Sequence, residues 1–292
     1  MIRSLLFIPG NLPNMLQNAY LFDADAIIFD LEDSVHILEK DNARNLVSEF
    51  LLSTKKPLNV ENLIRINSLD SPFFMNDLET LVSDKIDGIV VPKATIEILN
   101  KLNDVLSKIE NIKNMTTHLK LIPIIESAFS VLEVDQIASL PRVSGLLLGA
   151  EDLARDLGIT RTKKGNEIFY AREKVIMACA AFNILAIDTP YTDVYDDEGL
   201  KEDVILASSL GMKAKSAIHP RHIEWINKAF SPSMDDIKLA FSIIDAKKKA
   251  DLEGKGAFSV NGKMVDKPII DKALDTIARA KAFHLISDKN DQ

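Results

Sequence analysis

Eight short apolar runs, separated by longer stretches of helical periodicity, follow one another through the first 219 residues of this chain. Within each run the apolar residues are nearly continuous, whereas a strand with one face in water would alternate apolar and polar residues. Such runs are typical of strands in a parallel sheet that is covered on both faces. The runs are SLLFI (4–8), AIIFDL (26–31), LIRIN (63–67), GIVVP (88–92), LKLIPII (119–125), GLLLG (145–149), ILAID (184–188) and KSAIH (215–219).

Eight strands, each followed by a helix, predict an α/β fold of the (β/α)8 TIM-barrel class, whose usual length of about 250 residues suits this chain. A doubly wound open sheet is the alternative layout that the same alternation allows. We expect residues 1–230 to form the barrel, which is also the catalytic domain. The clearest helical stretches between the runs are 38–52, 95–111, 171–182 and 198–212.

The alternation stops beyond residue 230, and we expect residues 231–292 to form a C-terminal helix-loop-helix extension. Its first part reads as one long helix that ends at Gly254 and Gly256. A glycine-punctuated loop over 254–268 follows, and a last helix runs from Ile269 to about Leu285.

Charge and composition exclude several classes of function. Lys and Arg number 35 against 43 Asp and Glu, a net charge of −8, which is the wrong sign for a nonspecific nucleic-acid or anionic-membrane binder. No apolar run approaches the roughly 18 residues of a membrane span. The single cysteine, Cys179, excludes internal disulfides and any cysteine-rich metal site. We therefore expect a cytoplasmic enzyme that binds neither nucleic acid nor membrane.

The carboxyl ends of all strands in a β/α barrel converge on one mouth, and carboxylates are frequent there in this sequence. Glu126 and Asp152 follow the fifth and sixth runs, and Glu32 and Asp33 follow the second. A carboxylate-rich mouth without histidine pairs suits Mg²⁺, which takes one or two carboxylates and fills its octahedron with water and substrate oxygens. We expect Glu126 and Asp152 to coordinate one Mg²⁺, with Glu32 and Asp33 holding its waters.

Other interpretations of these carboxylates stay open. The string DLEDS (30–34) is also a helix-start signature, because Asp and Ser favour N-caps. Taken alone, Glu126 is equally compatible with an ordinary loop carboxylate at the end of a strand.

Arg65 is unusual because it lies inside the apolar run LIRIN, where a buried guanidinium needs anionic partners. Two interpretations remain: a pair with a barrel carboxylate, or a clamp on a substrate carboxylate or developing oxyanion. Lys93 follows the fourth run, and the same two interpretations apply to it less strongly: an ion pair with a barrel carboxylate or binding of a substrate anion. The strand ends offer no Ser-His or Cys-His pair, and no GxGxxG motif supports a nicotinamide cofactor.

Residue strings spread along the whole chain carry a family resemblance. They are RSLLFIPGN, DADAIIFDLEDSV followed by EKDNAR, LIRIN, IVVPKA, PIIES, LLLGAEDL and SVNGKMVDKPIIDKA. In this order they resemble the citrate lyase β-subunit (citryl-ACP/CoA lyase) family of the HpcH/HpaI aldolase superfamily, which also contains malyl-CoA and citramalyl-CoA lyases. The resemblance implies a (β/α)8 barrel, Mg²⁺ dependence, and cleavage of a 3-hydroxy-3-carboxyacyl thioester to an acetyl thioester and a 2-oxo acid.

The resemblance also implies roles for residues that match the family's motifs. Glu126 of PIIES and Asp152 of GAEDL match the metal ligands. Arg65 of LIRIN matches the arginine that contacts the reacting carbonyl and oxo-acid oxygens. Asp266 of GKMVD matches a carboxylate that, in related lyases, reaches the active site of the neighbouring subunit from a C-terminal lid.

Four further positions match by resemblance alone. Arg3 and Lys93 resemble parts of the thioester-carrier (CoA) site, and Glu32 and Asp33 resemble the family's outer metal shell. In the mechanism that this implies, Arg65 stabilises the oxygen of a thioester enolate, and Asp266 is the acid or base that transfers a proton at the enolate carbon.

Partners and substrate follow from the resemblance only in outline. His219 stands before Pro220 where citrate lyase β chains more often show Asn, and His-Pro is more like the free-standing CoA lyases. Substrate identity stays open between citryl and shorter malyl or citramalyl thioesters, and the carrier between CoA and acyl carrier protein. A lid that completes a neighbour's site implies a homo-oligomer, a trimer by family expectation. A citrate lyase complex would add the α and γ (acyl carrier protein) subunits.

Two other functions compete with the thioester lyase. One is a Mg²⁺-dependent class II aldolase on free hydroxy-oxo acids, which needs the same barrel and metal pair but no lid residue such as Asp266. The other is a non-catalytic subunit kept for assembly. The intact set of candidate metal ligands argues against this second alternative.

Overall fold

The computed structural model describes residues 1–252 and 258–287 and divides into two compact units. One unit is Ile2–Asn227, and the other is Lys228–Gln292 together with Met1. The division lies close to the boundary after residue 230 that the sequence suggests.

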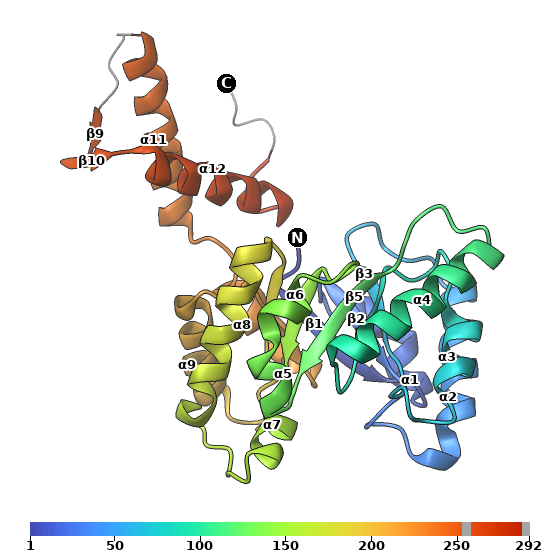
Figure 1. The fold of residues 1–292 in the computed structure, drawn as a ribbon. Coiled ribbons are helices and arrows are strands. Elements are labelled where there is room, and N and C mark those ends of the chain that lie inside the picture. Colours follow the sequence, from blue (N-terminus) through green and yellow to red (C-terminus); the bar gives the residue numbers. More distant parts are fainter. Residues whose placement is uncertain (253–257, 288–292) are drawn as a thin grey trace. The chain divides into compact units, whose positions relative to one another are not determined.

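The larger unit is a closed barrel of eight parallel strands in sequential order (Figure 1). Because β1 pairs with both β2 and β8, the sheet has no edge, and the open-sheet alternative is wrong. The predicted (β/α)8 fold is confirmed, with a strand at each of the eight apolar runs. The strands are β1 (Ser4–Pro9), β2 (Ala26–Asp30), β3 (Glu61–Arg65), β4 (Gly88–Val91), β5 (Lys120–Ile125), β6 (Gly145–Leu148), β7 (Leu185–Asp188) and β8 (Ala214–Ala217).

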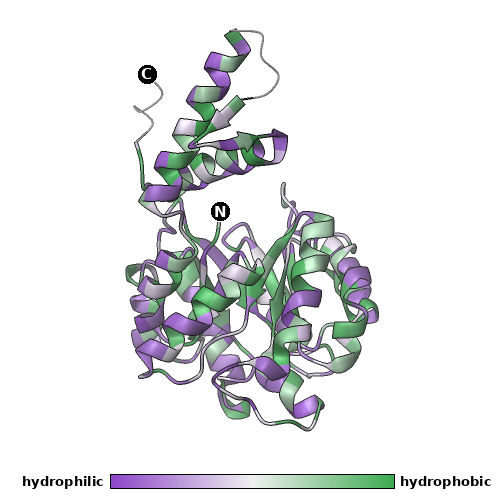
Figure 2. Ribbon diagram, turned by 90° about the vertical axis from the view of Figure 1, so that its left-hand side faces the viewer, coloured by the Kyte–Doolittle hydropathy of each residue, from purple (hydrophilic) through white to green (hydrophobic). Residues whose placement is uncertain are grey.

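Helices cover the outside of the barrel, and each packs through an apolar face. In Figure 2 the strands are hydrophobic, whereas the helices carry hydrophobic and hydrophilic residues side by side. The helices are α1 (Pro13–Gln17), α2 (Lys40–Ser53), α3 (Phe74–Leu81), α4 (Ile96–Ile112), α5 (Ala128–Leu132), α6 (Val134–Ala138), α7 (Ala150–Asp156), α8 (Phe169–Phe182), α9 (Asp197–Leu210) and α10 (Ile223–Ala229), with short 3-10 helices at Ala19–Leu21, Ile37–Glu39, Asn166–Ile168 and Pro220–His222.

The local sequence explains where these helices begin and which face they bury. Before α4, the Thr95 side chain accepts a hydrogen bond from the backbone N–H of Ile98, which is an N-cap. Leu99, Leu102 and Leu106 then recur at helical spacing and are fully buried against the barrel layer.

The strand residues that fill the barrel determine which residues reach its mouth. Successive side chains of a strand point to opposite faces, so the second residue after an interior one lies on the same face. The interior cluster contains Ile28, Leu63, Ile124, Leu147 and Ile187, with Leu5, Ala26, Val90, Ile122 and Ala214. Two positions further along the chain from the first five lie Asp30, Arg65, Glu126, Gly149 and Thr189.

The smaller unit contains α11 (Met234–Leu252), β9 (Phe258–Val260), β10 (Lys263–Val265) and α12 (Lys267–Ala282). Its core joins Ala240 and Ile243 of α11 to Val265 and to Ala273 of α12.

The expectation of a plain loop over 254–268 is wrong for the part that the structure describes. Strands β9 and β10 pair there as an antiparallel hairpin around Asn261 and Gly262. Both residues have positive φ, 50° and 75°, as a two-residue Asn-Gly hairpin turn requires. The predicted helix end at Gly254 and Gly256 lies outside the described residues.

Among residues 1–252 and 258–287, no helix combines the length and the apolar character that crossing a membrane would require.

Candidate active site

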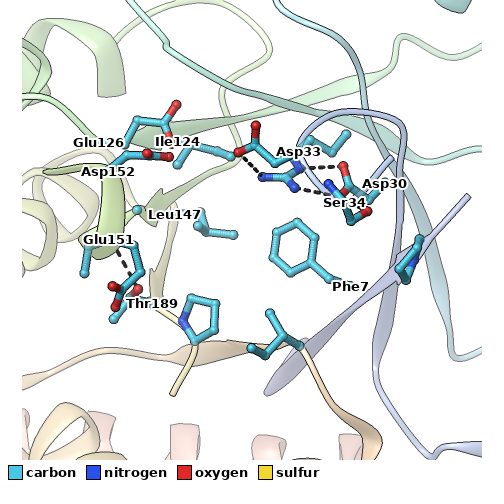
Figure 3. Close-up of a pocket in the computed structure, with 16 residues that line it drawn as sticks. Phe7, Asp30, Asp33, Ser34, Ile124, Glu126, Leu147, Glu151, Asp152 and Thr189 are labelled. Atoms are coloured by element: carbon cyan, nitrogen blue, oxygen red, sulfur yellow. Dashed lines mark hydrogen bonds and ion pairs between the residues drawn. The ribbon is translucent and has the colours of Figure 1, made fainter. Parts of the chain in front are cut away.

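A cavity of about 330 Å³ opens at the carboxyl ends of the barrel strands (Figure 3). Its wall includes the barrel-facing residues just described, Asp30, Arg65, Glu126 and Thr189, together with Asp152 at the start of α7. Residues from widely separated parts of the chain therefore meet at one mouth, as the barrel topology requires.

Glu126 and Asp152 lie next to each other, and their carboxylates share one side of the cavity (Figure 3). Glu126 directly follows β5, and Asp152 is in the first turn of α7, which follows β6. The two strands are neighbours, with Ile125 paired to Leu148. The predicted meeting of these two carboxylates is present in the structure.

The electrostatic environment of Glu126 favours a cation. The pKa of Glu126 is raised to about 7: burial is the main cause and the carboxylates of Asp152 and Glu32 add to it, against a hydrogen bond from the backbone N–H of Lys93 and the charge of Arg65. Two carboxylates beside a low-polarity wall repel each other, and a divalent cation between them removes this cost.

The donor set fits Mg²⁺ rather than a softer metal. No group of three or more His, Cys, Asp or Glu side chains within residues 1–252 and 258–287 is arranged to hold a metal ion. Mg²⁺ does not require such a cage, because it commonly binds through one or two carboxylates and keeps sites for water and substrate oxygens. Glu126 and Asp152 supply that number and type of ligand.

Gly149 makes room for the Glu126 side chain. A Cβ at this position would lie 2.6 Å from Cβ of Glu126 and 2.9 Å from its Oε2. These distances are closer than side-chain contacts in real proteins, so any larger residue here would push Glu126 aside.

Arg65 also lines the cavity, and acidic residues hold it in place. Its Nε and one terminal nitrogen each donate to Asp30, both at 2.6 Å, in a bidentate pair. The other terminal nitrogen lies 3.2 Å from a carboxylate oxygen of Glu32 and 3.8 Å from one of Asp33. The guanidinium also lies over the Phe7 ring, 5.0 Å from its centroid. Of the two interpretations of Arg65, pairing with a barrel carboxylate is present in the structure, and Arg65 also lines the cavity.

Comparison with known proteins identifies the family. The HpcH/HpaI aldolase/citrate lyase family model matches residues 3–220. The chain belongs to this family. It is 38% identical to the citrate lyase subunit beta of Leuconostoc mesenteroides subsp. cremoris over 292 residues, 98% of this chain and 96% of the relative. It is 33% identical to a (3S)-malyl-CoA thioesterase of Cereibacter sphaeroides over 281 residues, covering 96% and 95% of the two chains.

A solved structure is similar along nearly the whole chain. It is protein CitE from Mycobacterium tuberculosis in complex with magnesium, acetoacetate and coenzyme A, with 28% identity and a TM-score of 0.76, and it covers 95% of this chain and 97% of that one. The near full-length similarity to citrate lyase β subunits makes this HpcH/HpaI protein a carbon–carbon lyase.

Asp30 is a site residue to which the sequence alone assigned no role. Burial would raise its pKa, but the ion pair with Arg65 and hydrogen bonds from Ser34 and the Glu32 backbone hold the pKa of Asp30 below its usual value. Asp30 is therefore an anion that anchors Arg65 and the start of the following loop. Strand alternation was the available signal, because Asp30 lies two residues after the interior Ile28.

Glu32 and Asp33 lie on the loop after β2, on the Arg65 side of the cavity. Asp33 lines the cavity with a largely exposed side chain, whereas Glu32 is buried. Burial raises the pKa of Glu32 to about 7, with Arg65 opposing the shift and Asp33 adding to it. Their role as holders of magnesium-bound water stays a prediction.

Lys93 contributes to the site through its backbone. Its φ of 50° is in the left-handed region, and this conformation allows its N–H to reach Glu126. The side chain lines a separate groove of about 790 Å³ between the segment after β3 and α4, together with Lys101, Phe74 and Ile98.

Arg3 does not lie at the site. It precedes β1, at the strand end opposite the one that lines the cavity, and its guanidinium donates to Asp25 at 2.9 and 2.8 Å. The expectation that Arg3 belongs to the thioester-carrier site is at odds with this position. The string RSLLFIPGN places Arg3 and the mouth residue Pro9 close in sequence, but a strand separates them by its full length.

Asp266 lies in the smaller unit, where it is exposed and caps α12 by accepting a hydrogen bond from the backbone N–H of Ile269 at 3.3 Å. Its predicted catalytic role stays a prediction.

Proposed function

We propose that this lyase cleaves a 3-hydroxy-3-carboxyacyl thioester, of the citryl, citramalyl or malyl type, to an acetyl thioester and a 2-oxo acid with Mg²⁺ as cofactor. The observation that carries the proposal is the pair of neighbouring carboxylates, Glu126 and Asp152, in one cavity with Arg65. A relative named citrate lyase subunit beta and a similar structure with magnesium, acetoacetate and coenzyme A support it.

Glu126 and Asp152 would hold the metal, which when bound lowers the pKa of the substrate hydroxyl and polarises the emerging ketone. As the hydroxyl oxygen loses its proton, the bond between its carbon and the thioester α-carbon breaks. The electron pair passes to the thioester as an enolate, and the hydroxyl carbon becomes the carbonyl carbon of the 2-oxo acid. Protonation of the α-carbon then gives the acetyl thioester.

Arg65 is suited to the negative charge that this reaction develops. Asp30 fixes its guanidinium by two hydrogen bonds, so the charge is oriented before substrate arrives and needs no reorganisation during the reaction. We propose that Arg65 stabilises the enolate and oxo-acid oxygens. Asp266 is the proposed acid or base at the enolate carbon, carried on a lid that excludes water.

The groove beside Lys93 is the proposed place of the thioester arm. The groove is adjacent to the Glu126 and Asp152 carboxylates, because the backbone N–H of the same Lys93 donates a hydrogen bond to Glu126. The side chains of Lys93 and Lys101 suit a phosphate on the arm, and Phe74 and Ile98 suit its apolar part. The arm can belong to coenzyme A or to an acyl carrier protein. We also propose a homo-oligomer, a trimer by resemblance, which in a citrate lyase complex would join α and γ subunits.

A substrate panel tests the reaction directly. The purified protein is incubated with citryl-CoA, (S)-citramalyl-CoA, malyl-CoA or a free hydroxy-oxo acid, with Mg²⁺ or with EDTA, and release of 2-oxo acid and loss of the thioester are followed. We expect release from at least one thioester with Mg²⁺, none with EDTA, and none from the Glu126→Gln variant. Release only from free hydroxy-oxo acids would instead identify an aldolase, and hydrolysis without 2-oxo acid would identify a thioesterase.

Substitutions at Lys93 test the groove. Lys93→Gly keeps the left-handed backbone, and so the N–H donated to Glu126, but removes the ammonium group. We expect KM for the CoA thioester to rise several-fold with unchanged Mg²⁺ affinity. Lys93→Ala is the matched comparison, because it removes the same ammonium group but keeps the Cβ, and with it the left-handed backbone strain of about 1 kcal/mol that Lys93 already bears. An unchanged KM in Lys93→Gly would remove the groove from the proposal.

A further inference from the structure

A closed set of four charged side chains lies buried between the barrel and its helices. Arg172 of α8, Asp188 of β7, Asp203 of α9 and Lys215 of β8 form this buried quartet. The side chains of Arg172, Asp188 and Lys215 are 0% exposed and that of Asp203 is 6% exposed. The two positive and two negative charges balance.

The contacts of Lys215 reach beyond the quartet. Its ammonium group donates to Asp188 at 2.7 Å, to Asp203 at 2.6 Å, and to the backbone carbonyl oxygen of Thr189 at 2.6 Å. An ammonium group has three N–H donors, so all three are used. Ser216 of the same strand donates to the carbonyl oxygen of Asp188 at 3.0 Å. The backbone just beyond β7 is therefore held from β8 at two successive carbonyl groups.

Thr189 connects the buried quartet to α7, the helix that carries Asp152. Its side-chain oxygen accepts a hydrogen bond from the backbone N–H of Ala150 at 3.3 Å (Figure 3). Ala150 is the first residue of α7, and the preceding Gly149 has no side chain to cap the helix. Backbone N–H groups in a first helical turn lack partners within the helix, so Thr189 supplies a cap from another strand. Asp152 lies in that same turn.

The energetics favour a geometric role for the quartet. Burying four charges is costly, and apolar replacements of buried ion pairs are often neutral or stabilising. One terminal nitrogen of Arg172 lacks a partner, but the other charged groups of the quartet are hydrogen-bonded to one another. What such an ionic cluster provides is a fixed geometry, here at the strand end that faces the cavity.

We propose that Thr189 and the buried quartet are positioning residues for the metal site: Lys215 fixes the Thr189 backbone, and the Thr189 hydroxyl fixes the first turn of α7, so that Asp152 stays beside Glu126. This inference rests on the proposed magnesium function. It assigns to Thr189 no contact with the metal and no part in proton transfer.

The test is calorimetric titration of the full-length protein with Mg²⁺. Thr189→Val keeps the shape of the side chain but removes the hydroxyl group, and we expect about 10-fold weaker Mg²⁺ binding, in line with other residues that orient metal ligands. Thr189→Ser retains the hydroxyl and should restore affinity to near the wild-type value. In turnover assays, Thr189→Val should raise the KM for Mg²⁺ and leave kcat at saturating Mg²⁺ nearly unchanged.

Two further variants separate positioning from general stability. The double variant Lys215→Met with Asp203→Asn removes one charge of each sign, so Arg172 and Asp188 stay paired, and it should weaken Mg²⁺ binding like Thr189→Val. Arg142→Met breaks a different buried ion pair, with Glu110, at the start of β5 and β6, and should lower the melting temperature without changing Mg²⁺ affinity.

The possible results are distinct. Wild-type Mg²⁺ affinity in Thr189→Val overturns the positioning role while the metal site stands. Equal weakening in Thr189→Val and Arg142→Met also overturns it, because the effect would then be one of stability. If the wild-type protein binds no Mg²⁺ at all, the proposed function itself fails.

Discussion

At the scale of single residues, the candidate site concentrates acids whose pKa values burial has shifted. The pKa of Glu126 and that of Glu32 are both raised to about 7, while Asp30 is held ionised by Arg65. The site therefore contains two kinds of carboxylate. Asp30 stays ionised and holds the Arg65 guanidinium, whereas Glu126 and Glu32 take up a proton near neutral pH unless a bound metal ion stabilises their charged form.

Mg²⁺ binding should depend on pH through Glu126. Below about pH 7 the metal-free protein holds a proton on Glu126, and Mg²⁺ must displace it, so affinity should rise as pH increases toward 7 and then level off. Calorimetry in buffers of different ionisation enthalpy should show about one proton released per ion near pH 6 and almost none near pH 8.5. The Glu32→Gln variant should still release this proton, and its complete absence there would assign the release to Glu32 instead.

The same raised pKa has the opposite sign for the stability of the metal-free protein. The folded state binds the Glu126 proton more tightly than the unfolded chain, whose carboxyl titrates at the usual value of 4.5. This group's contribution to stability is therefore full below 4.5 and is lost as pH rises through about 7.

The sequence allowed a residue to be placed in the site where both its type and its position relative to a strand were informative. Glu126 and Asp152 follow neighbouring strands, so their meeting followed from the fold, and Arg65 was conspicuous in an apolar strand. The partner of Arg65 could not be chosen among the three carboxylates at and just after the end of β2, because register decides it: Asp30 pairs directly with Arg65 across β2 and β3. Arg3 was misplaced because closeness in sequence does not imply closeness in a strand.

At the scale of secondary-structure elements, the site depends on how β5, β6 and β7 end. Glu126 needs the space above Gly149 at the end of β6, and α7 needs a cap from the end of β7. These dependences join three neighbouring strands into one wall.

Gly149→Ala should damage the metal site more than the fold. The added Cβ would overlap the Glu126 side chain, so we expect Mg²⁺ affinity to fall at least about 10-fold, with a stability loss of about 1–3 kcal/mol from overpacking. Gly145→Ala, at the other end of β6, is the matched control. Its Cβ would lie 2.9 Å from the carbonyl oxygen of Leu185, a similar clash away from both carboxylates.

Denaturant unfolding and Mg²⁺ titration of both variants separate the two effects. Gly145→Ala should lose stability and keep its Mg²⁺ affinity. Equal Mg²⁺ affinities in the two variants would contradict the idea that Gly149 makes room for Glu126.

The strands were predictable because a parallel barrel buries both faces of each strand, which gives continuous apolar runs. The hairpin of β9 and β10 was missed, although its Asn261-Gly262 turn is a strong hairpin signal. The glycines in that segment favoured a loop, and its strands are only three residues long. The capping of α7 by Thr189 could not be predicted, because only tertiary contacts bring β7 to that helix.

At the scale of the whole molecule, the smaller unit carries Asp266, the proposed acid or base. Asp266→Asn should keep the cap of α12, because Asn caps helices about as well as Asp. We expect unchanged Mg²⁺ binding and a loss of turnover of roughly 10²- to 10⁴-fold. Asp271→Asn, on the same helix and in an exposed pair with Lys267, is the control and should be fully active. Normal turnover in Asp266→Asn would exclude this residue from the mechanism.

Mixing two inactive variants tests whether subunits share sites. If Asp266 acts in a neighbouring subunit, refolding Glu126→Gln together with Asp266→Asn should restore part of the activity. Some sites then combine intact Glu126 and Asp152 from one subunit with intact Asp266 from the other. A mixture that stays inactive, with proven subunit exchange, would place Asp266 in the site of its own chain.

The most direct measurement of the central claim is Mg²⁺ binding by calorimetry to the wild-type protein and to Glu126→Gln, Asp152→Asn and Glu151→Gln. Glu151 neighbours Asp152 but pairs with Arg161 at 3.1 Å, so it controls for charge in the same helical turn. We predict one site in the wild type, affinity reduced by at least about 100-fold in Glu126→Gln and Asp152→Asn, and near wild-type affinity in Glu151→Gln. Wild-type binding in either Glu126→Gln or Asp152→Asn would contradict the account.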